Sequence, residues 1–315
     1  MKHRMVFVLL ILMMTVSVAT SAPMQDESYK PFLGRWDLTL HAPQRDYPSW
    51  LEISDKNGEL SAQFVSRWGN ARAPSKVAVS NGVLTFVSPK SEEERPDDMI
   101  FEGKRTGNTL SGTTTGQDGT PWTWTARRAP ALKRTDSGKW GKPVELFNGK
   151  DLSGWKTETP NPAKPWSVEN GTLVSPGNGP DLVTDAKFED FKLHVEFNCG
   201  PNANSGIYLR GRYEIQIETN SIQEPPTHHT GGVYGFIAPS PELPRKSGWQ
   251  TFDIKLIGRT VTVVQNGQTV IDHQEIPGIT GGALDSHEEL AGPIYLQGGE
   301  DGHVAFRKIV ISPMK

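Results

Sequence analysis

A short segment, SGIYLRGRYEIQI at residues 205–217, brings several chemically active side chains close together. Aliphatic residues alternate with polar ones along both halves of the segment, which is the period of a β-strand. One face of the resulting ribbon would carry Tyr208, Arg210, Glu214 and Gln216. A carboxyl group can accept a proton when ionised and donate one when protonated, and a guanidinium can hold an oxyanion through its fixed fork of donors. The segment therefore predicts a polar face that could serve a ligand.

The preceding predicted strand would extend this polar face. In FKLHVEFNC, residues 191–199, the apolar residues Leu193, Val195 and Phe197 share one face and Glu196 falls on the other. We expect Glu196 to project beside Arg210 and Glu214. Cross-strand ladders of opposite charge also stabilise sheets without any further role. The residues alone leave both interpretations open, a ligand site and a structural ion-pair network.

The N-terminus has the features of a secretory signal peptide. Two basic residues precede an apolar run at positions 5–18, and small residues follow up to Ala22. The run is shorter than the ~20 residues that a membrane-spanning helix needs. We expect residues 1–22 to be removed and the mature chain to be exported to a bacterial periplasm or to the extracellular space.

The charge balance and cysteine content exclude several classes of protein. Without Lys2 and Arg4, 31 basic residues stand against 36 acidic ones, a net charge of about −5 for the mature chain. We therefore expect neither nucleic acid nor a membrane surface as a partner. No other segment is long and apolar enough to span a membrane. The single cysteine, Cys199, cannot form an internal disulfide, and we expect it to pack as a small hydrophobe.

The fold class indicated is all-β. The 315 residues, typical of about two domains, include 32 glycines and 24 prolines, and helical periodicity is scarce. Asn-Gly pairs, which favour tight hairpin turns, begin at positions 57, 81, 148, 170 and 266. Residues 27–130 contain about seven short strands and predict a small lipocalin-like barrel or a sandwich. Its tryptophans could line a ligand cavity, although core and rim packing is favoured: Trp36, Trp50, Trp68, Trp122 and Trp124.

A second all-β domain follows a linker. Residues 131–142, ALKRTDSGKWGK, are charged, small and unpatterned, as linkers are. Residues 143–315 contain about ten or more segments with strand-like alternation. This number of antiparallel strands favours a two-sheet jelly roll with one concave sheet.

An ordered set of motifs in this second domain resembles the 3-keto-disaccharide hydrolase family. The motifs are LFNGKDLSGW (146–155), WSVENGTLV (166–174), DFKLHVEFNCGPNANSGIYLRGRYEIQI (190–217), GGVYG (231–235), SGWQTFDIKL (247–256), VVQNGQTVID (263–272), GPIYLQ (292–297) and VAFRKI (304–309). The resemblance covers essentially all of residues 143–315 and says nothing of residues 23–142. It implies a concanavalin- or laminin-G-like antiparallel jelly-roll sandwich.

The resemblance also implies a hydrolase acting on sugars whose C3 hydroxyl has been oxidised to a ketone. Such a ketone acidifies the hydrogen on C2, and its removal gives an enediolate that expels the glycosidic oxygen from C1. Water can then add back, which gives net hydrolysis. The site needs a base near C2, donors around the C3 oxygen and an acid for the leaving group. An ordinary glycosidase would instead flank C1 with two carboxylates.

With the resemblance, the polar face is interpreted as a carbohydrate site. Glu196 and Glu214 would supply base and acid, and Arg210 would hold the enediolate or a ring hydroxyl. The predicted substrate contacts are Asn204, Ser205, Tyr208, Gln216, Tyr234, Trp249, Gln297, Glu300 and His303. The last two stand in for a histidine that the family often shows before a glycine, because here Gly298 directly follows Gln297.

No cofactor is firmly implied. The His228-His229 pair lacks the carboxylate-histidine spacing of a metal site, and residues 218–248 are interpreted as a long loop that rims the trough. A divalent cation such as calcium could be bound through loop oxygens, or the same residues could simply form turns: Asp151, Asp181 and Asp185.

Three functions remain in competition. The first is an exported enzyme that cleaves 3-keto-glycosides, and the second is a non-catalytic carbohydrate-binding protein of the cell envelope. The third is a structural or partner-binding envelope protein. The N-terminal domain fits each of them, because it could bind glycan, contribute to the cleft or mediate assembly.

Overall fold

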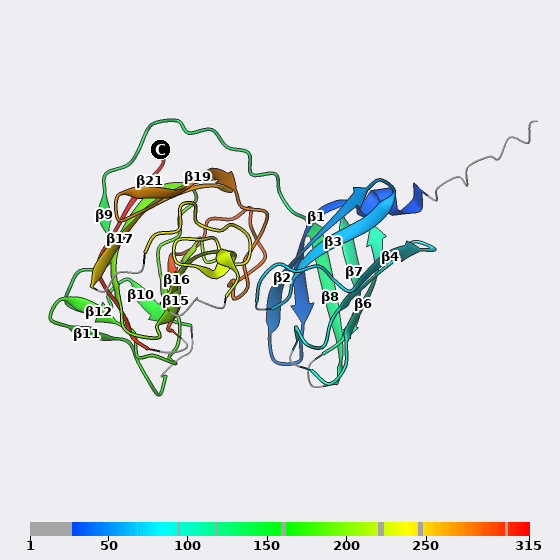
Figure 1. Cartoon of the computed structure of the whole chain (residues 1–315), viewed down its shortest axis with the longest axis horizontal. Helices are drawn as coiled ribbons and strands as arrows, with labels where there is room; N and C mark the ends of the chain where they lie inside the picture. The colour runs from blue at the N-terminus through cyan, green and yellow to red at the C-terminus, as the bar shows by residue number, and fades with distance from the viewer. Residues whose placement is uncertain are drawn as a thin grey trace, which may run out of the picture.

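The computed structural model describes residues 27–67, 69–93, 95–116, 119–158, 162–219, 224–244, 248–299 and 302–315. The predicted signal peptide, Trp68 and Glu300 lie outside these residues. Figure 1 shows two β-rich lobes, joined by an extended segment that runs from the end of β8 to β9. Within the described ranges, no helix combines the length and the apolar character that crossing a membrane requires.

The N-terminal lobe is one antiparallel sheet that curls into a barrel (Figure 1). After the 3-10 helix η1 (Glu27–Phe32), its strands are β1 (Gly34–His41), β2 (Asp46–Lys56), β3 (Glu59–Val65), β4 (Lys76–Ser80), β5 (Val83–Ser88), β6 (Met99–Thr106), β7 (Thr109–Thr115) and β8 (Pro121–Arg128). β1 pairs with both β2 and β8, so the two outer strands of the described sheet are β3 and β4, which contact each other. This agrees with the predicted small barrel and adds one strand to the expected seven.

Aromatic side chains fill the barrel. Burial alternates along β5, β6 and β8, which turns one side of each strand inward. Phe86 and Phe101 stack with ring centroids 4.4 Å apart, and Trp124 packs edge-on against both. Trp36 is fully buried in the same cluster. Trp36, Trp122 and Trp124 therefore serve as barrel core, which is the favoured interpretation.

The C-terminal lobe is a sandwich of two antiparallel sheets. One sheet is ordered β10 (Trp155–Thr157), β13 (Leu182–Thr184), β20 (Tyr295–Leu296), β15 (Asn204–Leu209) and β16 (Tyr213–Glu218). The other is ordered β11 (Ser167–Glu169), β12 (Thr172–Val174), β21 (Val304–Pro313), β14 (Phe191–Cys199), β17 (Trp249–Ile257), β18 (Thr260–Gln265) and β19 (Gln268–Glu275), and β9 (Val144–Glu145) pairs with β21. The second 3-10 helix is η3 (Pro226–His228). This is the predicted two-sheet jelly roll.

Four of the five Asn-Gly pairs form the tight turns expected of them. Asn57, Asn81, Asn170 and Asn266 all have positive φ and are followed by a glycine with positive φ, between paired strands. The pair at 148–149 does not close a hairpin. Instead the Asn148 side chain accepts hydrogen bonds from the backbone N–H groups of residues 150 and 151.

The two lobes are packed tightly against each other. Trp50 of β2 is fully buried and belongs to the core cluster of the jelly roll, with its ring 5.3 Å from that of Phe236. A Cβ at Gly278 would lie 2.1 Å from the Trp50 indole nitrogen, so only glycine permits this approach. Arg35 also pairs with Glu275 across the interface at 2.5 Å. The barrel is therefore held in a defined position on the jelly roll.

Candidate active site

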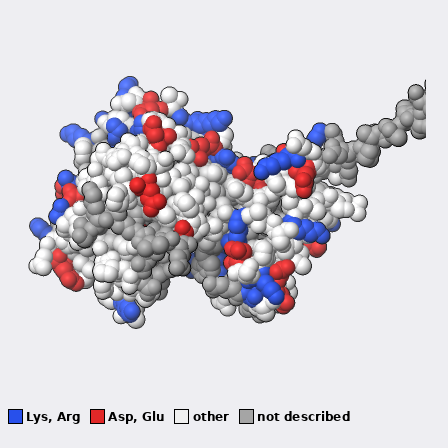
Figure 2. Space-filling model, in the orientation of Figure 1, with Lys and Arg blue, Asp and Glu red and all other residues white. Residues whose placement is uncertain are grey.

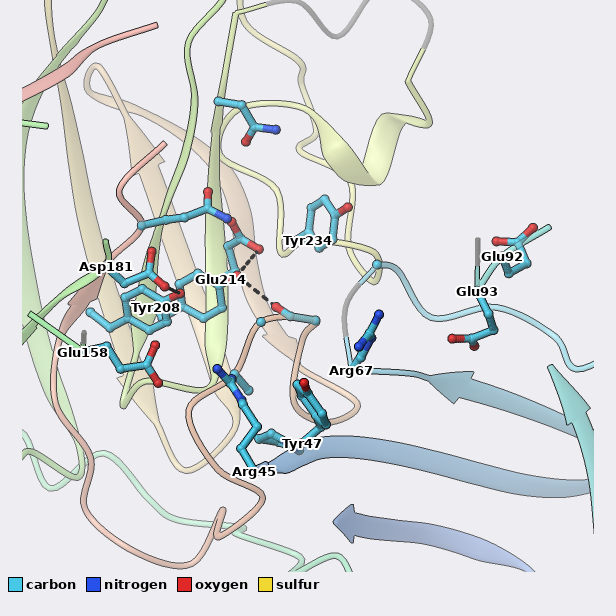
Figure 3. Close-up of a pocket in the computed structure, with 18 residues that line it drawn as sticks. Arg45, Tyr47, Arg67, Glu92, Glu93, Glu158, Asp181, Tyr208, Glu214 and Tyr234 are labelled. Atoms are coloured by element: carbon cyan, nitrogen blue, oxygen red, sulfur yellow. Dashed lines mark hydrogen bonds between the residues drawn. The ribbon is translucent and has the colours of Figure 1, made fainter. Parts of the chain in front are cut away.

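A cavity of about 640 Å³ lies where the barrel meets the five-stranded sheet. The jelly-roll wall contains Glu158, Asp181, Asn204, Tyr208, Glu214, Tyr234, Gly281, Gly282, Ala283, Tyr295 and Gln297. The barrel wall contains Arg45, Tyr47, Pro48, Arg67, Gly69, Glu92 and Glu93. Figure 3 shows the two sets facing each other across the opening. The volume lies within the ~300–1,000 Å³ of ordinary small-molecule sites.

Glu214 is a carboxylate held at the floor of this cavity. It is only 3% exposed, and its Oε2 lies 2.8 Å from the Tyr208 hydroxyl (Figure 3). The two residues are direct partners across β15 and β16. A Cβ at Gly206 would lie 2.1 Å from Glu214 Oε1, so the glycine of the NSG motif makes room for the carboxylate.

A pair of stacked tyrosines continues this floor. The rings of Tyr208 and Tyr295 are nearly parallel, with centroids 4.2 Å apart. Burial, followed by the charge of Glu214 for one and of Asp181 for the other, holds both phenol pKa values well above their usual range. Both hydroxyls therefore keep their protons at neutral pH and can donate hydrogen bonds.

Two further carboxyl groups lie beside the tyrosines. Asp181 accepts hydrogen bonds from the Tyr295 hydroxyl at 2.7 Å and from the Gly298 N–H at 3.0 Å. Burial raises the pKa of Asp181. The pKa of Glu158 is also raised, by loss of hydration and then by the charge of Asp181, although part of its side chain remains exposed. Carboxyl groups with raised pKa values in a cleft are candidates for proton transfer.

The barrel wall is cationic and aromatic close to these carboxyls. The guanidiniums of Arg45 and Arg67 lie 4.8 Å and 5.3 Å from the centre of the Tyr47 ring. The positive charge of Arg45 lowers the pKa of Glu158 and of Asp181, which partly offsets the effect of burial. Charged groups of both lobes therefore influence the pKa values of the cavity carboxyls.

The structure brings together five of the residues that the sequence predicted for the site. Asn204, Tyr208, Glu214, Tyr234 and Gln297 all line the cavity. Tyr234 stacks on His228 with ring centroids 4.4 Å apart, so the loop at 224–244 does border the site. Gln297 follows β20, the central strand of the five-stranded sheet.

The expectation that Glu196 shares a face with Glu214 is wrong. β14 belongs to the eight-stranded sheet, and Glu196 lies on its outer side, where it pairs with Arg307 at 2.5 Å. That pairing lowers the pKa of Glu196. Trp249 lies nearby with Arg307 over its ring at 4.3 Å, on β17 of the same sheet. Neither residue lines the cavity.

Arg210 also departs from its expected position. The hairpin between β15 and β16 begins at Arg210, which has a φ of 54° and so leaves the strand alternation. Its side chain is fully buried and donates to the Gly258 carbonyl at 2.6 Å and to the Tyr213 hydroxyl at 3.1 Å. Arg210 supports the lobe interior and does not line the cavity.

Three other predicted contacts serve the fold of the jelly roll. The Ser205 hydroxyl donates to the Gln297 carbonyl at 2.8 Å. Gln216 is buried, and its backbone pairs with residues 231 and 232. His303 Nδ1 lies 2.9 Å from the Ser175 carbonyl oxygen. These three side chains are not among the cavity residues, and Glu300 lies outside the described residues.

The aspartates considered for calcium do not converge. Asp151 accepts hydrogen bonds from Asn148 and Ser153 within its own turn, and Asp185 lies 3.5 Å from Lys156. Asp181 belongs to the cavity. Among the described residues, no group of three or more histidine, cysteine, aspartate or glutamate side chains could hold a metal ion.

Sequence reasoning missed several cavity residues, and for different reasons. Asp181 was considered only as a calcium ligand, and Tyr295 lies in GPIYLQ, a motif used for the resemblance but not for the site. Glu158 stands in a short loop without pattern. The barrel residues Arg45 and Arg67 could not have been found, because no local pattern reveals which part of one domain contacts another.

Comparison with known proteins gives a consistent result. A family model described as the 3-keto-alpha-glucoside-1,2-lyase-like domain matches residues 142–312. A curated 3-keto-disaccharide hydrolase of Bacteroides thetaiotaomicron is 30% identical over 76 residues, which cover 21% of this chain and 26% of that protein. The match thus spans about a quarter of that relative.

Two solved structures from Parabacteroides distasonis, both provisionally named glycosyl hydrolases, are also similar. The first is 29% identical, covers 55% of this chain and 89% of the other, and has a TM-score of 0.47. The second is 22% identical, covers 55% and 94%, and has a TM-score of 0.45.

Proposed function

The chain belongs to the 3-keto-alpha-glucoside-1,2-lyase-like family, and from that premise we propose that it cleaves glycosides whose C3 carbon is a ketone. The observation that carries this proposal is the buried Glu214 carboxylate beside the Tyr208 hydroxyl, at the floor of a cavity in the matched domain. The site thus offers a base whose orientation is fixed by a hydrogen bond.

Glu214 is the proposed base. Its carboxylate takes the proton from C2, and the electron pair of that bond forms the enediolate with the C3 oxygen. Collapse of the enediolate restores the ketone, forms a C1–C2 double bond and breaks the bond from C1 to the glycosidic oxygen. Water then adds to C1, and Glu214, whose proton has exchanged with solvent in the open cavity, protonates C2, so the net reaction is hydrolysis.

The other cavity groups would assist this sequence. Glu158, whose pKa is raised, is the proposed acid that protonates the departing glycosidic oxygen. The Tyr208 hydroxyl donates to Glu214 and so holds the carboxylate in a fixed orientation before substrate binds. Asp181 holds the hydroxyl of Tyr295 and thereby the stacked tyrosine pair.

The proposal is tested by comparing substrates. Purified mature protein is incubated with a 3-keto-disaccharide and, in parallel, with the unoxidised parent sugar, and released monosaccharide is followed by mass spectrometry. We expect release from the keto sugar alone. Binding of both sugars without release from either would contradict the reaction and favour a carbohydrate-binding function.

We also propose that the protein is exported. The proposal rests on the basic start, the apolar run and the small residues within positions 1–22. Expression of the full-length gene in a bacterial host, followed by fractionation and N-terminal sequencing, would test it. A mature protein that retains residues 1–22 would contradict it.

A further inference from the structure

One wall of the cavity comes from outside the region that defines the family. The family model begins at residue 142, whereas Arg45, Tyr47 and Arg67 belong to the barrel. We propose that the barrel is a working part of the substrate site and that Arg45 binds the leaving-group sugar. This inference rests on the proposed function and narrows its substrates to glycosides with a second sugar ring.

Arg45 projects from the barrel toward the jelly-roll wall of the cavity (Figure 3). It is exposed in the loop between β1 and β2, and its charge acts on Glu158 and Asp181 of the opposite wall. Figure 3 shows its side chain extending across the opening toward them. Among the described residues, its guanidinium has no ion pair or hydrogen bond and contacts the Tyr47 ring. Its donors are therefore available to a ligand.

The barrel wall is also held in a fixed position relative to Tyr208 and Glu214. The Gly282 N–H donates to the Arg67 carbonyl at 3.3 Å, and the neighbouring Gly281 carbonyl lies 2.9 Å from the Tyr208 hydroxyl. Two consecutive residues of one loop thus connect the barrel to the tyrosine beside Glu214. Since Trp50 fixes the barrel on the jelly-roll core as well, the second wall is formed before substrate arrives.

The division of groups between the walls identifies the subsite. Every cavity carboxyl proposed to transfer a proton lies on the jelly-roll wall, so the 3-keto ring must lie there. The remaining part of a disaccharide then reaches the barrel wall, where guanidinium donors suit ring hydroxyl oxygens. A methyl aglycone lacks the ring hydroxyls that these donors would bind.

The test compares two substrates with Arg45→Ala and a matched control, Arg105→Ala. Arg105 is an exposed barrel arginine that bonds only locally, to the Gly107 carbonyl, and does not line the cavity. KM is measured for a 3-keto-disaccharide and for methyl 3-keto-glucoside. In Arg45→Ala we expect the KM for the disaccharide, divided by the KM for the methyl glucoside, to rise about tenfold. Loss of a charged hydrogen bond to the second sugar ring predicts a change of this size. Arg105→Ala should leave the ratio unchanged.

Calorimetric binding of the unoxidised parent disaccharide separates this inference from the reaction itself. If the wild type binds the disaccharide but cleaves neither keto sugar, the proposed reaction fails, and the barrel subsite is judged by whether Arg45→Ala weakens the Kd about tenfold. If Arg45→Ala changes neither the Kd nor the KM ratio by more than about twofold relative to the wild type, the proposed subsite is overturned. A wild type that binds no sugar would overturn both proposals.

Discussion

The Tyr208 hydroxyl lies 2.8 Å from Glu214 Oε2 and 2.9 Å from the Gly281 carbonyl oxygen, and it has one proton to donate. The strand pairing sets this contact, because Tyr208 and Glu214 are direct partners in the β15–β16 register. The carboxylate therefore has an oriented donor beside it and open cavity above it.

Glu214→Gln keeps the shape of the side chain and removes its basicity. We expect kcat for a 3-keto-disaccharide to fall about 10²–10⁴-fold, the usual contribution of a general base. Binding of the parent disaccharide should be retained. Stopped assays of sugar release, together with calorimetry, would measure the two quantities, and a variant with near-normal kcat would remove Glu214 from the mechanism.

Glu158→Gln should change the pH dependence of kcat/KM. A group that must be protonated to work is lost as the pH rises through its pKa, and the raised pKa of Glu158 extends the active range upward. We expect kcat/KM of the wild type to fall on the alkaline side and this limb to disappear in Glu158→Gln, at a lower overall rate. Rates from pH 4 to 9 would show this, and identical alkaline limbs would assign the acid elsewhere.

Glu196→Gln is expected to leave catalysis intact. Glu196 lies on the outer face of the eight-stranded sheet, bound to Arg307. Surface ion pairs contribute only ~0–1 kcal/mol to stability, so kcat/KM should stay within about twofold of the wild type. A loss comparable to that of Glu214→Gln would mean that the outer face takes part in the reaction.

The buried Asp37 should make stability depend on pH. Burial and the neighbouring charge of Glu288 raise the pKa of Asp37 to about 10, although Arg127 and Arg259 counteract this. Because the unfolded carboxyl loses its proton near pH 4, the folded state is favoured below that pH. Its stability then falls as the pH rises toward 10, by at most about 1.4 kcal/mol per pH unit.

Asp37→Asn removes this titration. We expect urea unfolding at pH 5, 7 and 9 to show the wild type losing stability relative to Asp37→Asn as the pH rises. The partner Glu288 accepts a hydrogen bond from the Tyr213 hydroxyl at 2.6 Å, and we expect this bond to persist in Asp37→Asn. Parallel stability curves would show that the carboxyl is ionised in the folded state.

Local patterns predicted much of the fold. The alternation in YEIQIE and in GIYL indicated strands, and the structure confirms that Tyr208 and Glu214 share a face. Four Asn-Gly turns and the buried aromatic core of the barrel also follow from short-range chemistry. In each case the residues that decide the structure are neighbours in the chain.

The wrong predictions concern side chains whose positions cannot be read from the alternation of neighbouring residues. Consecutive strands β14 and β15 belong to different sheets, which alternation cannot reveal, so Glu196 was assigned to the wrong face. Arg210 left the alternation because the turn begins one residue earlier than expected. The barrel wall with Arg45 depends on how two domains pack, and this information is spread over residues such as Trp50 and Gly278.

The central claim is that Glu214 removes the proton from C2 and later protonates C2 with a proton that has exchanged with solvent. It is tested most directly by running the reaction of a 3-keto-disaccharide in D2O and locating deuterium in the 3-keto product by NMR and mass spectrometry. Elimination followed by hydration predicts one deuterium at C2 for each wild-type turnover, above the exchange seen without enzyme and with Glu214→Gln. Full turnover with the C2 hydrogen retained would contradict the account and indicate direct hydrolysis at C1.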